Sequence, residues 1–304
     1  MEKFRGVDYY GIEELLTEEE RMVRDAIRDW VEAEFLPLVA QHHREETFPT
    51  HLIPKLGELG VFGATLKGYG CAGLNNVAYG LITQELERGD SGLRSCASVQ
   101  SSLVMYPIYT YGSEAQKEKW LPRLQRGEAV GCFGLTEPDH GSDPGSMKTR
   151  ALKKGDSYVL NGTKLWITNG SIADVAVVWA KGDDGEIGGY LVETGTPGFS
   201  TLDIHGKFSM RASITSELSF QDCRIPLENK FPTVTGLRGP LGCLSQARYG
   251  IAWGAIGAAM ACYDWALQYA QTRVQFGKPI AQFQLVQRKL VWMLTEITKA
   301  QLLA

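Results

Sequence analysis

The chain has 304 residues, 44% of them hydrophobic and 22% charged, and its 31 basic and 35 acidic residues leave a net charge of -4. This is ordinary globular composition, and the interspersed charges argue against a nucleic-acid-binding protein. The apolar, uncharged stretch of residues 249–263 is shorter than the ~20 apolar residues of a membrane span. We therefore expect a soluble protein with no membrane span and with two or three domains.

Cysteine and histidine show no metal-ligand spacing. The six cysteines form no CxxC pair, and the five histidines form no ligand pattern. A chain of this length needs no disulfide staples, so we expect free thiols and no bound metal. No signal peptide follows Met1, which suits a bacterial cytoplasm or a mitochondrial matrix protein after processing.

Residues 1–130 are predicted to form an N-terminal α-helical domain. Thr17 and Glu20 fit a capping box, and apolar residues then recur at helical spacing. Ser113 and Gln116 fit a second capping box. The other predicted helices cover residues 52–60, 77–89 and 99–111.

Residues 131–238 are predicted to form a central antiparallel β-domain. Short β-prone runs are separated by glycine and aspartate, with no helical crossover between them. Asn161-Gly162 lies between two such runs and predicts a hairpin turn, because both turn positions favour positive φ. The predicted strands cover residues 130–135, 158–160, 163–167, 175–180, 189–192 and 218–223.

Residues 239–304 are predicted to begin a C-terminal helical bundle. One long helix is expected over residues 248–273, with small residues that would allow close packing. A second helix is expected from residue 282 to the end, where no cap, Gly or Pro closes it. Both helices would expose broad apolar faces unless other subunits or further chain cover them, so we expect this last domain to be incomplete.

The first candidate site is the segment FGLTEPDHGSD, residues 133–143. A strand end is followed there by a turn rich in Pro, Asp and Gly, and such turns present N–H groups and hydroxyls that can bind anions or polar ring edges. Thr136 and Ser142 supply hydroxyls, and Gly141 allows a ligand to approach the backbone. A plain exit from strand to loop remains the alternative.

The second candidate site is the segment WITNG, residues 166–170, in the far arm of the predicted hairpin. A tryptophan and a threonine at a strand end can stack on an aromatic ligand and donate a hydrogen bond to it. A core tryptophan beside a β-favouring threonine is the alternative.

Together the two segments, TEPDHGSD and then NGTKLWITNG, resemble the flavin-binding signature of the acyl-CoA dehydrogenase family. The order of helical, β and helical parts is typical of that family, as is the later motif TRVQFGKPIAQFQ, residues 272–284. The resemblance covers essentially the whole chain. It implies an α+β fold in which FAD lies between the β-domain and the C-terminal helices.

The resemblance implies a role for each matching residue. Thr136 would hydrogen-bond the edge of the flavin, Trp166 would pack against the isoalloxazine, and Thr168 would donate toward its reactive nitrogen. Arg273 would reach the pyrophosphate of a neighbouring subunit's FAD, because a guanidinium matches phosphate oxygens. The implied cofactor-binding residues are Phe133, Leu135, Thr136, Gly141, Ser142, Trp166, Ile167 and Thr168, with Arg273, Gln275, Phe276 and Gln284 reaching the neighbouring subunit.

A finer resemblance concerns ELERGDSGLRSCASVQSS, residues 85–102. This segment is similar to the substrate loop of the glutaryl-CoA dehydrogenase branch, in which an arginine holds the distal carboxylate of the acyl chain. A buried carboxylate needs such a charge-assisted partner. A structural arginine that caps helix carbonyls is the alternative. The implied substrate-binding residues are Glu87, Arg94, Ser95, Ser98, Ser142, Arg248 and Tyr249.

The implied reaction is FAD-dependent α,β-dehydrogenation of an acyl-CoA thioester, with glutaryl-CoA, an intermediate of amino-acid degradation, as the expected substrate. In that branch decarboxylation to crotonyl-CoA follows, and a homotetramer passes its electrons to electron-transfer flavoprotein. The family's base is a Glu of the C-terminal helical domain, and no residue here matches it. We therefore assign no catalytic residue and expect the base beyond Ala304. Glu87 would lie at the distal end of the acyl chain, where it cannot reach the α-proton.

Two alternatives stay open. The chain is either a truncated form that binds FAD or acyl-CoA without turnover, or a dehydrogenase for another short or branched acyl-CoA.

Overall fold

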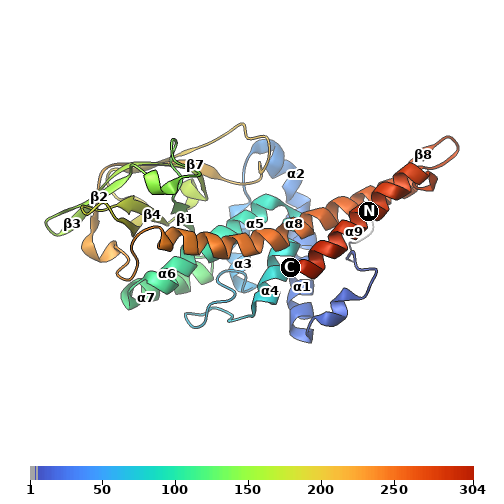
Figure 1. Cartoon of the computed structure of the whole chain (residues 1–304), viewed down its shortest axis with the longest axis horizontal. Coiled ribbons are helices and arrows are strands. Elements are labelled where there is room, and N and C mark those ends of the chain that lie inside the picture. The colour runs from blue at the N-terminus through green and yellow to red at the C-terminus, as the bar shows by residue number, and fades with distance from the viewer. Residues whose placement is uncertain (1–3, 5) are drawn as a thin grey trace.

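Residues 4 and 6–304 are described by a computed structural model, in which a helical part, a sheet and a long helical pair follow one another (Figure 1). The N-terminal helices are α1 (Glu18–Trp30), α2 (Leu36–Glu45), α3 (Ile53–Glu58), α4 (Asn76–Gly89), α5 (Ser91–Ser98), α6 (Tyr106–Tyr111) and α7 (Glu114–Gln125). The strands of the sheet are β1 (Gly131–Gly134), β2 (Arg150–Lys154), β3 (Ser157–Thr168), β4 (Val175–Lys181), β5 (Ile187–Glu193), β6 (Phe199–Asp203) and β7 (Thr215–Pro226). The C-terminal elements are α8 (Arg238–Thr272), β8 (Val274–Gln275), β9 (Lys278–Pro279) and α9 (Gln284–Leu303).

Local capping signals in the helical part are confirmed. Thr17 accepts a hydrogen bond from the backbone N–H of Glu20 at 3.3 Å and donates its own N–H to the Glu20 carboxylate at 2.8 Å. Ser113 and Gln116 form the second capping box in the same way. A π-helical segment, Val99–Met105, joins α5 to α6 without interrupting the helical run.

The sheet is mixed rather than purely antiparallel. Its strand order is β1-β4-β2-β3-β7-β6, with β5 paired to β4. β1 pairs with β4 in parallel, β2 meets β4 in parallel at Arg150 and Lys181, and the remaining pairs are antiparallel. The antiparallel prediction is therefore wrong for two pairs, because a long connection through β2 and β3 brings the chain into β4 in the same direction as β1.

The hairpin predicted at Asn161-Gly162 is also wrong. β3 runs through both residues, and the turn from β2 to β3 lies at Gly155, which has a φ of 65°. Gly162 marks an irregularity in the pairing with β7. A Cβ there would lie 2.5 Å from Oγ1 of Thr149, so the glycine lets β3 approach the residue that precedes β2. The WITNG segment is consequently the end of β3 and the residues after it.

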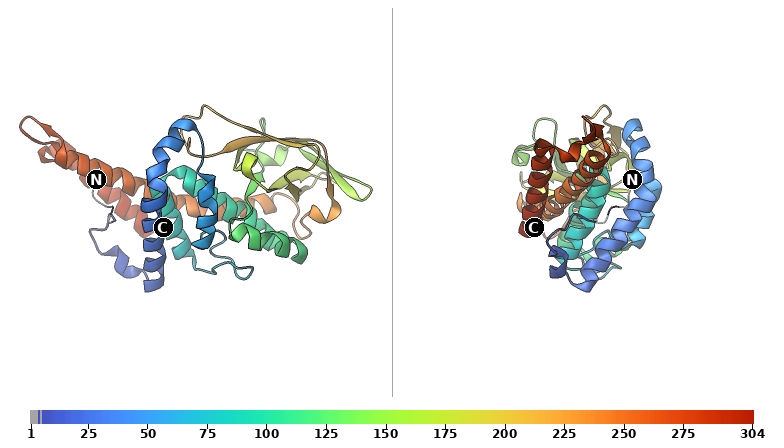
Figure 2. Two further views of the ribbon diagram at one scale, coloured as in Figure 1. Left: turned by 180° about the vertical axis from the view of Figure 1, so that it is seen from behind. Right: turned by 90° about the vertical axis from the view of Figure 1, so that its right-hand side faces the viewer.

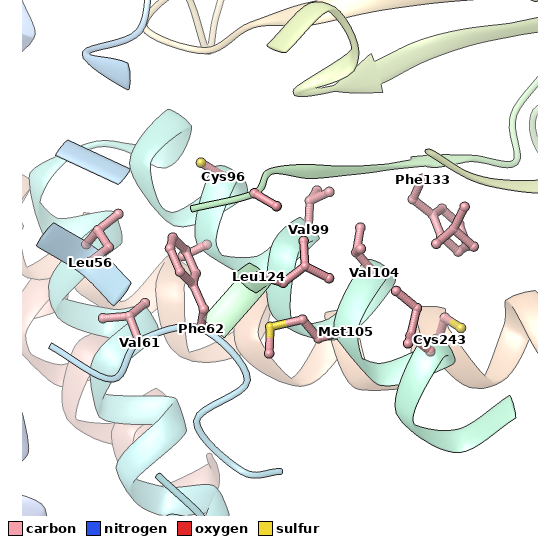
Figure 3. Close-up of a cluster of buried hydrophobic side chains, with 14 of the residues drawn as sticks. Leu56, Val61, Phe62, Cys96, Val99, Val104, Met105, Leu124, Phe133 and Cys243 are labelled. Carbon is pink, nitrogen blue, oxygen red and sulfur yellow. The ribbon is translucent and has the colours of Figure 1, made fainter. Parts of the chain in front are cut away.

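The core joins the sheet to the helices. One cluster of buried side chains includes Phe133 of β1, Val104 of the π-helical segment and Cys243 of α8 (Figure 3). A Cβ on Gly131 would lie 2.3 Å from Val104, so the glycine lets β1 rest on the helix. Gln100 fixes this contact by accepting the N–H of Gly131 at 2.8 Å. The start of β1 is thereby held against the helical part.

The C-terminal helices form an arm. α8 begins at Arg238, earlier than the predicted Arg248, and runs from the sheet to the β8–β9 hairpin at the tip (Figure 1). Seen from behind, the arm protrudes beyond the helical part (Figure 2). Exposed apolar side chains along it include Trp265, Tyr269, Phe276, Leu285, Val291, Trp292 and Leu303.

Two further predictions concern the whole chain. All six cysteines are free. Within residues 4 and 6–304, no helix combines the length and the hydropathy that crossing a membrane requires.

Candidate functional site

A cavity of about 350 Å³ opens where β1 and β3 end against the helices. Its volume lies in the range of small-molecule clefts. Four segments of the chain line it: the π-helical segment, the loop after β1, the end of β3 and the start of α8. The lining residues are Val99, Leu103, Phe133, Leu135, Thr136, Gly141, Ser142, Pro144, Trp166, Ile167, Thr168, Leu241, Leu244 and Arg248. Both candidate segments of the sequence therefore face one cavity.

The loop after β1 presents its hydroxyls through a tight turn. Glu137 and His140 exchange both backbone hydrogen bonds, each at 3.2 Å. Thr136 precedes this turn and Ser142 follows it. Among the described residues, the hydroxyl groups of Thr136 and Ser142 make no hydrogen bond. Both remain able to bond a ligand.

Trp166 owes its position to a bulge in β3. The pairing with β7 shifts register between Lys164 and Ile167, and Trp166 has a φ of 63°. A positive φ is unusual for a bulky residue and marks local strain. In a regular strand Trp166 would lie on the same face as the buried Lys164. The bulge instead leaves the indole 58% exposed, at the wall of the cavity.

The donor set of the cavity fits a flat heteroaromatic ring. Apolar side chains and an exposed indole provide stacking surfaces, and the hydroxyls of Thr136 and Thr168 provide polar contacts at the edge. The space beside Gly141 is open, because a Cβ at this residue would meet only Thr136 Cγ2, at 3.8 Å. The fold itself does not require glycine at that position, whereas close approach of a ligand would.

Arg94 and Glu87 form a buried pair outside the cavity. Arg94 Nε lies 2.7 Å from Glu87 Oε2, and both side chains are 9% exposed. The pair joins α4 to α5. Arg94 therefore bonds a carboxylate rather than the helix carbonyls of the structural alternative. Ser95 and Ser98 are buried on the same helix, and Val99, which lines the cavity, follows Ser98 directly.

The structure separates two neighbouring predicted residues. Arg248 lines the cavity from α8, whereas Tyr249 lines a second, polar cavity of about 260 Å³. The Tyr249 hydroxyl donates to the carbonyl of Asn76 at 2.9 Å, and its ring stacks on Tyr79. Consecutive residues point to different sides of a helix, which accounts for the separation.

The four late residues lie on the arm. Arg273 directly follows α8, and Gln275 and Phe276 belong to the hairpin at the tip, where Phe276 is 92% exposed. Gln284 begins α9. None of them lines the cavity of their own chain.

The sequence analysis missed the apolar lining residues on the helices. Val99 and Leu103 are four residues apart on the π-helical run, and Leu241, Leu244 and Arg248 are three and four apart on α8. These are the spacings of one helix face. That signal was present in the sequence, but it does not distinguish a cavity wall from a buried face.

The chain belongs to the acyl-CoA dehydrogenase family, whose members are FAD-dependent oxidoreductases. Residues 17–128 match the model of the acyl-CoA dehydrogenase N-terminal domain, residues 132–223 that of the middle domain, and residues 235–304 that of the C-terminal domain. The residues that line the cavity fit the ring of this cofactor.

Three known proteins illustrate the similarity. A glutaryl-CoA dehydrogenase of Mycobacterium smegmatis in complex with FADH2 has a TM-score of 0.96 at 50% identity, over 98% of this chain and 77% of that one. The mitochondrial short-chain specific acyl-CoA dehydrogenase of Rattus norvegicus is 39% identical, over 97% of this chain and 73% of that protein. A chain in a structure of the electron transferring flavoprotein of Acidaminococcus fermentans has a TM-score of 0.91 at 37% identity, over 97% of this chain and 78% of that one.

Proposed function

We propose that this protein dehydrogenates a short dicarboxylic acyl-CoA, with glutaryl-CoA as its substrate, and passes electrons to an electron-transfer flavoprotein. The observation that carries the proposal is the buried pair of Arg94 and Glu87. A dehydrogenase for purely apolar acyl tails gains nothing from burying an arginine there, because desolvating its charge costs free energy. A substrate with a distal carboxylate gives that charge a second partner.

In the proposed complex the chain's own residues divide the work. The loop with Thr136 and the indole of Trp166 hold the flavin ring between them, and Thr168 donates to its edge. Bound FAD supplies the acceptor for the hydrogen that leaves the β-carbon of the acyl chain. Arg248 faces the CoA portion at the mouth of the cavity, and Val99 and Leu103 exclude water from the acyl chain.

The general base is proposed to lie outside the residues of this cavity. No Asp, Glu or His is among the described residues that line it. Glu87 accepts a hydrogen bond from Arg94 and does not line the cavity. A carboxylate that does not line this cavity is therefore proposed to remove the α-proton.

Arg273, Gln275, Phe276 and Gln284 are proposed to contact the FAD of a neighbouring subunit in a homotetramer. Their position on an exposed arm, away from the cavity of the same chain, supports this role. The exposed apolar side chains of α8 and α9 supply surface for such an assembly.

A dehydrogenase for an uncharged short acyl-CoA is the second candidate. Glu87 already neutralises Arg94, with contacts of 2.7 and 3.4 Å between their polar atoms. A neutral pocket needs no further charge from the substrate. The similarity to the short-chain specific enzyme of rat also favours an uncharged short acyl-CoA as the substrate.

An anaerobic titration separates the two candidates. The protein is loaded with FAD, and the visible absorbance of the flavin is followed as glutaryl-CoA or butyryl-CoA is added. Stronger binding and bleaching with glutaryl-CoA support the dicarboxylic substrate, and a preference for butyryl-CoA supports the second candidate. Binding of both without bleaching means that the chain holds its ligands without turning them over.

A further inference from the structure

Lys164 is a charged side chain that the fold buries completely. Its exposed fraction is 0% and that of Glu137 is 4%. Nζ of Lys164 donates to Oε1 of Glu137 at 2.9 Å and to the carbonyl of Leu135 at 3.0 Å. The Glu137 carboxylate also accepts the backbone N–H groups of Lys148 at 2.6 Å and Thr149 at 2.9 Å. We call Lys164 and Glu137 the buried clamp.

Fold stability alone does not account for the buried clamp. Removing two charges from water costs several kcal/mol per ion, and replacing such a pair by apolar residues of similar volume often leaves stability unchanged or higher. The surroundings are already apolar, with Met147 and Leu218 packed close to the Lys164 side chain. An all-apolar core would serve the sheet equally well.

The buried clamp joins the two segments that face the cavity. Lys164 bonds Leu135 and Glu137, and the N–H of Leu165 donates to the carbonyl of Thr136 at 2.8 Å. Three consecutive residues of the loop after β1 are thus tied to two consecutive residues of β3. β1 takes its ladder hydrogen bonds from β4, so these contacts hold its exit loop to β3.

The buried clamp also precedes the strained part of β3. Trp166 comes two residues after Lys164 and holds its positive φ at the register shift. Such a conformation persists only where the surrounding contacts fix it. With Lys164 bonded on one side and the strand paired again at Ile167 on the other, the backbone of Trp166 is held from both sides.

We infer that Lys164 and Glu137 are positioning residues, which set the separation between Thr136 and Trp166 and so orient the flavin ring between them. The inference rests on the flavin contacts proposed above for those two residues. Neither member of the buried clamp lines the cavity, so both act through the residues that do.

The test replaces both charges at once, so that no lone charge stays buried. The double variant Lys164→Met and Glu137→Gln keeps the volume, and its Gln can still accept a backbone N–H. Free FAD is the probe, and the readouts are FAD affinity, the visible circular dichroism of bound flavin and urea unfolding without flavin. The control is Arg88→Met with Glu85→Gln, which removes two members of a buried ion-pair network on α4 that also contains Arg28 and Glu32.

We expect the clamp variant to unfold at the urea midpoint of the parent, to bind FAD roughly tenfold more weakly, and to give an altered circular dichroism spectrum. The control is expected to lose stability and to leave the spectrum of bound flavin unchanged. An unchanged affinity and spectrum in the clamp variant would overturn the inference.

If the double variant does not fold, Lys164→Gln with Glu137→Gln, which also leaves no lone charge buried, repeats the test. Failure of both variants to fold makes the pair structural and overturns the inference. If the parent protein binds no FAD, the flavin contacts proposed for Thr136 and Trp166 are wrong. That result differs from a failure of the inference about Lys164 and Glu137, in which the parent binds FAD and the variant binds it equally well.

Discussion

Gly254 of α8 lies directly over Glu87 of α4, so closely that a Cβ on Gly254 would lie 1.9 Å from Oε2 of Glu87. The next atom of another side chain in its path is Nε of Arg94, at 3.3 Å. The buried pair of Glu87 and Arg94 occupies the space that a side chain at position 254 would fill. α8 therefore helps to set the position of the charges on which the proposed specificity depends.

Alanine at two neighbouring glycines of α8 should have different effects. In Gly254→Ala the new methyl meets the end of a flexible side chain, which can turn aside at modest cost. In Gly257→Ala it would lie 1.9 Å from the backbone carbonyl oxygen of Gln84, so α4 itself must move. We expect Gly257→Ala to lose more unfolding free energy, by about 1–3 kcal/mol. Urea unfolding measures both, and equal losses would contradict the difference in contacts.

The charges of Arg94 and Glu87 should control substrate choice. Arg94→Ala alone leaves Glu87 buried without a partner and should cost stability. The double variant Arg94→Gln and Glu87→Gln avoids this and is the cleaner probe. It should weaken glutaryl-CoA binding by about 2 kcal/mol and leave butyryl-CoA binding nearly unchanged. Calorimetric titration of both ligands checks this, and parallel losses would refute the carboxylate role of Arg94.

Trp166→Gly should separate stability from cofactor binding. Glycine relieves the strain of a φ of 63° but adds freedom to the unfolded chain. These effects oppose each other, so the unfolding free energy should change by less than about 1 kcal/mol. FAD affinity should fall, because a stacking surface is lost.

Met210→Gly is the matched control for Trp166→Gly. Met210 has a φ of 51° and does not line the cavity. Its replacement should leave FAD affinity unchanged. A large loss of stability in Trp166→Gly would show that the indole belongs to the core.

Acidification should release the contacts of Glu137. Burial raises the pKa of Glu137, but hydrogen bonds from Lys148, Thr149 and Lys164 outweigh it and bring the pKa from 4.5 to about 2. The pKa of Glu137 is lower in the folded than in the unfolded protein, so its ionised form stabilises the fold. This stabilisation is complete above the ordinary pKa of 4.5 and is lost as the pH falls through the folded-state pKa. Burial lowers the pKa of Lys164 to about 8, so both groups are charged between these values.

The free energy of unfolding should therefore decline as the pH falls from about 4.5 toward about 2, where Glu137 takes up its proton in the folded state. Glu137→Gln has no carboxylate to protonate, so its free energy of unfolding should be flatter across this range. Urea unfolding at several pH values measures both proteins. Identical profiles for the variant and the parent would assign the acid response to other groups.

Sequence signals of short range predicted local structure correctly. The capping boxes at Thr17 and Ser113 form because their hydrogen bonds join residues three apart, independently of the rest of the fold. The Asn161-Gly162 turn did not form, although its local signal was strong. There the close approach of Thr149 decided the role of Gly162, and that contact is set by tertiary structure.

The start of α8 also depends on tertiary contacts and was not predicted correctly. The long helix was predicted to begin at Arg248, yet Gly239 and Pro240 already lie in its first turn, where proline is tolerated. A Cβ on Gly239 would lie 2.5 Å from the Trp179 ring. Gly239 allows α8 to lie close to the sheet, and a single sequence does not reveal such a tertiary contact.

The candidate site, too, was predicted only where the signal lay in a local motif. The two motifs around Thr136 and Trp166 pointed to one cavity, and the structure brings them together. The buried clamp was not foreseen, because nothing local distinguishes Lys164 from the exposed lysines of a strand. Its role depends on an interaction with Glu137 across 27 residues of chain.

α8 is one uninterrupted helix of 35 residues, and it contributes to the cavity near one end and carries the hairpin at the other. A helix of this length measures about 50 Å, so tilting it by about one degree at the cavity would shift the hairpin by about 1 Å. The length of α8 would therefore enlarge a small tilt at the cavity into a larger displacement of the hairpin.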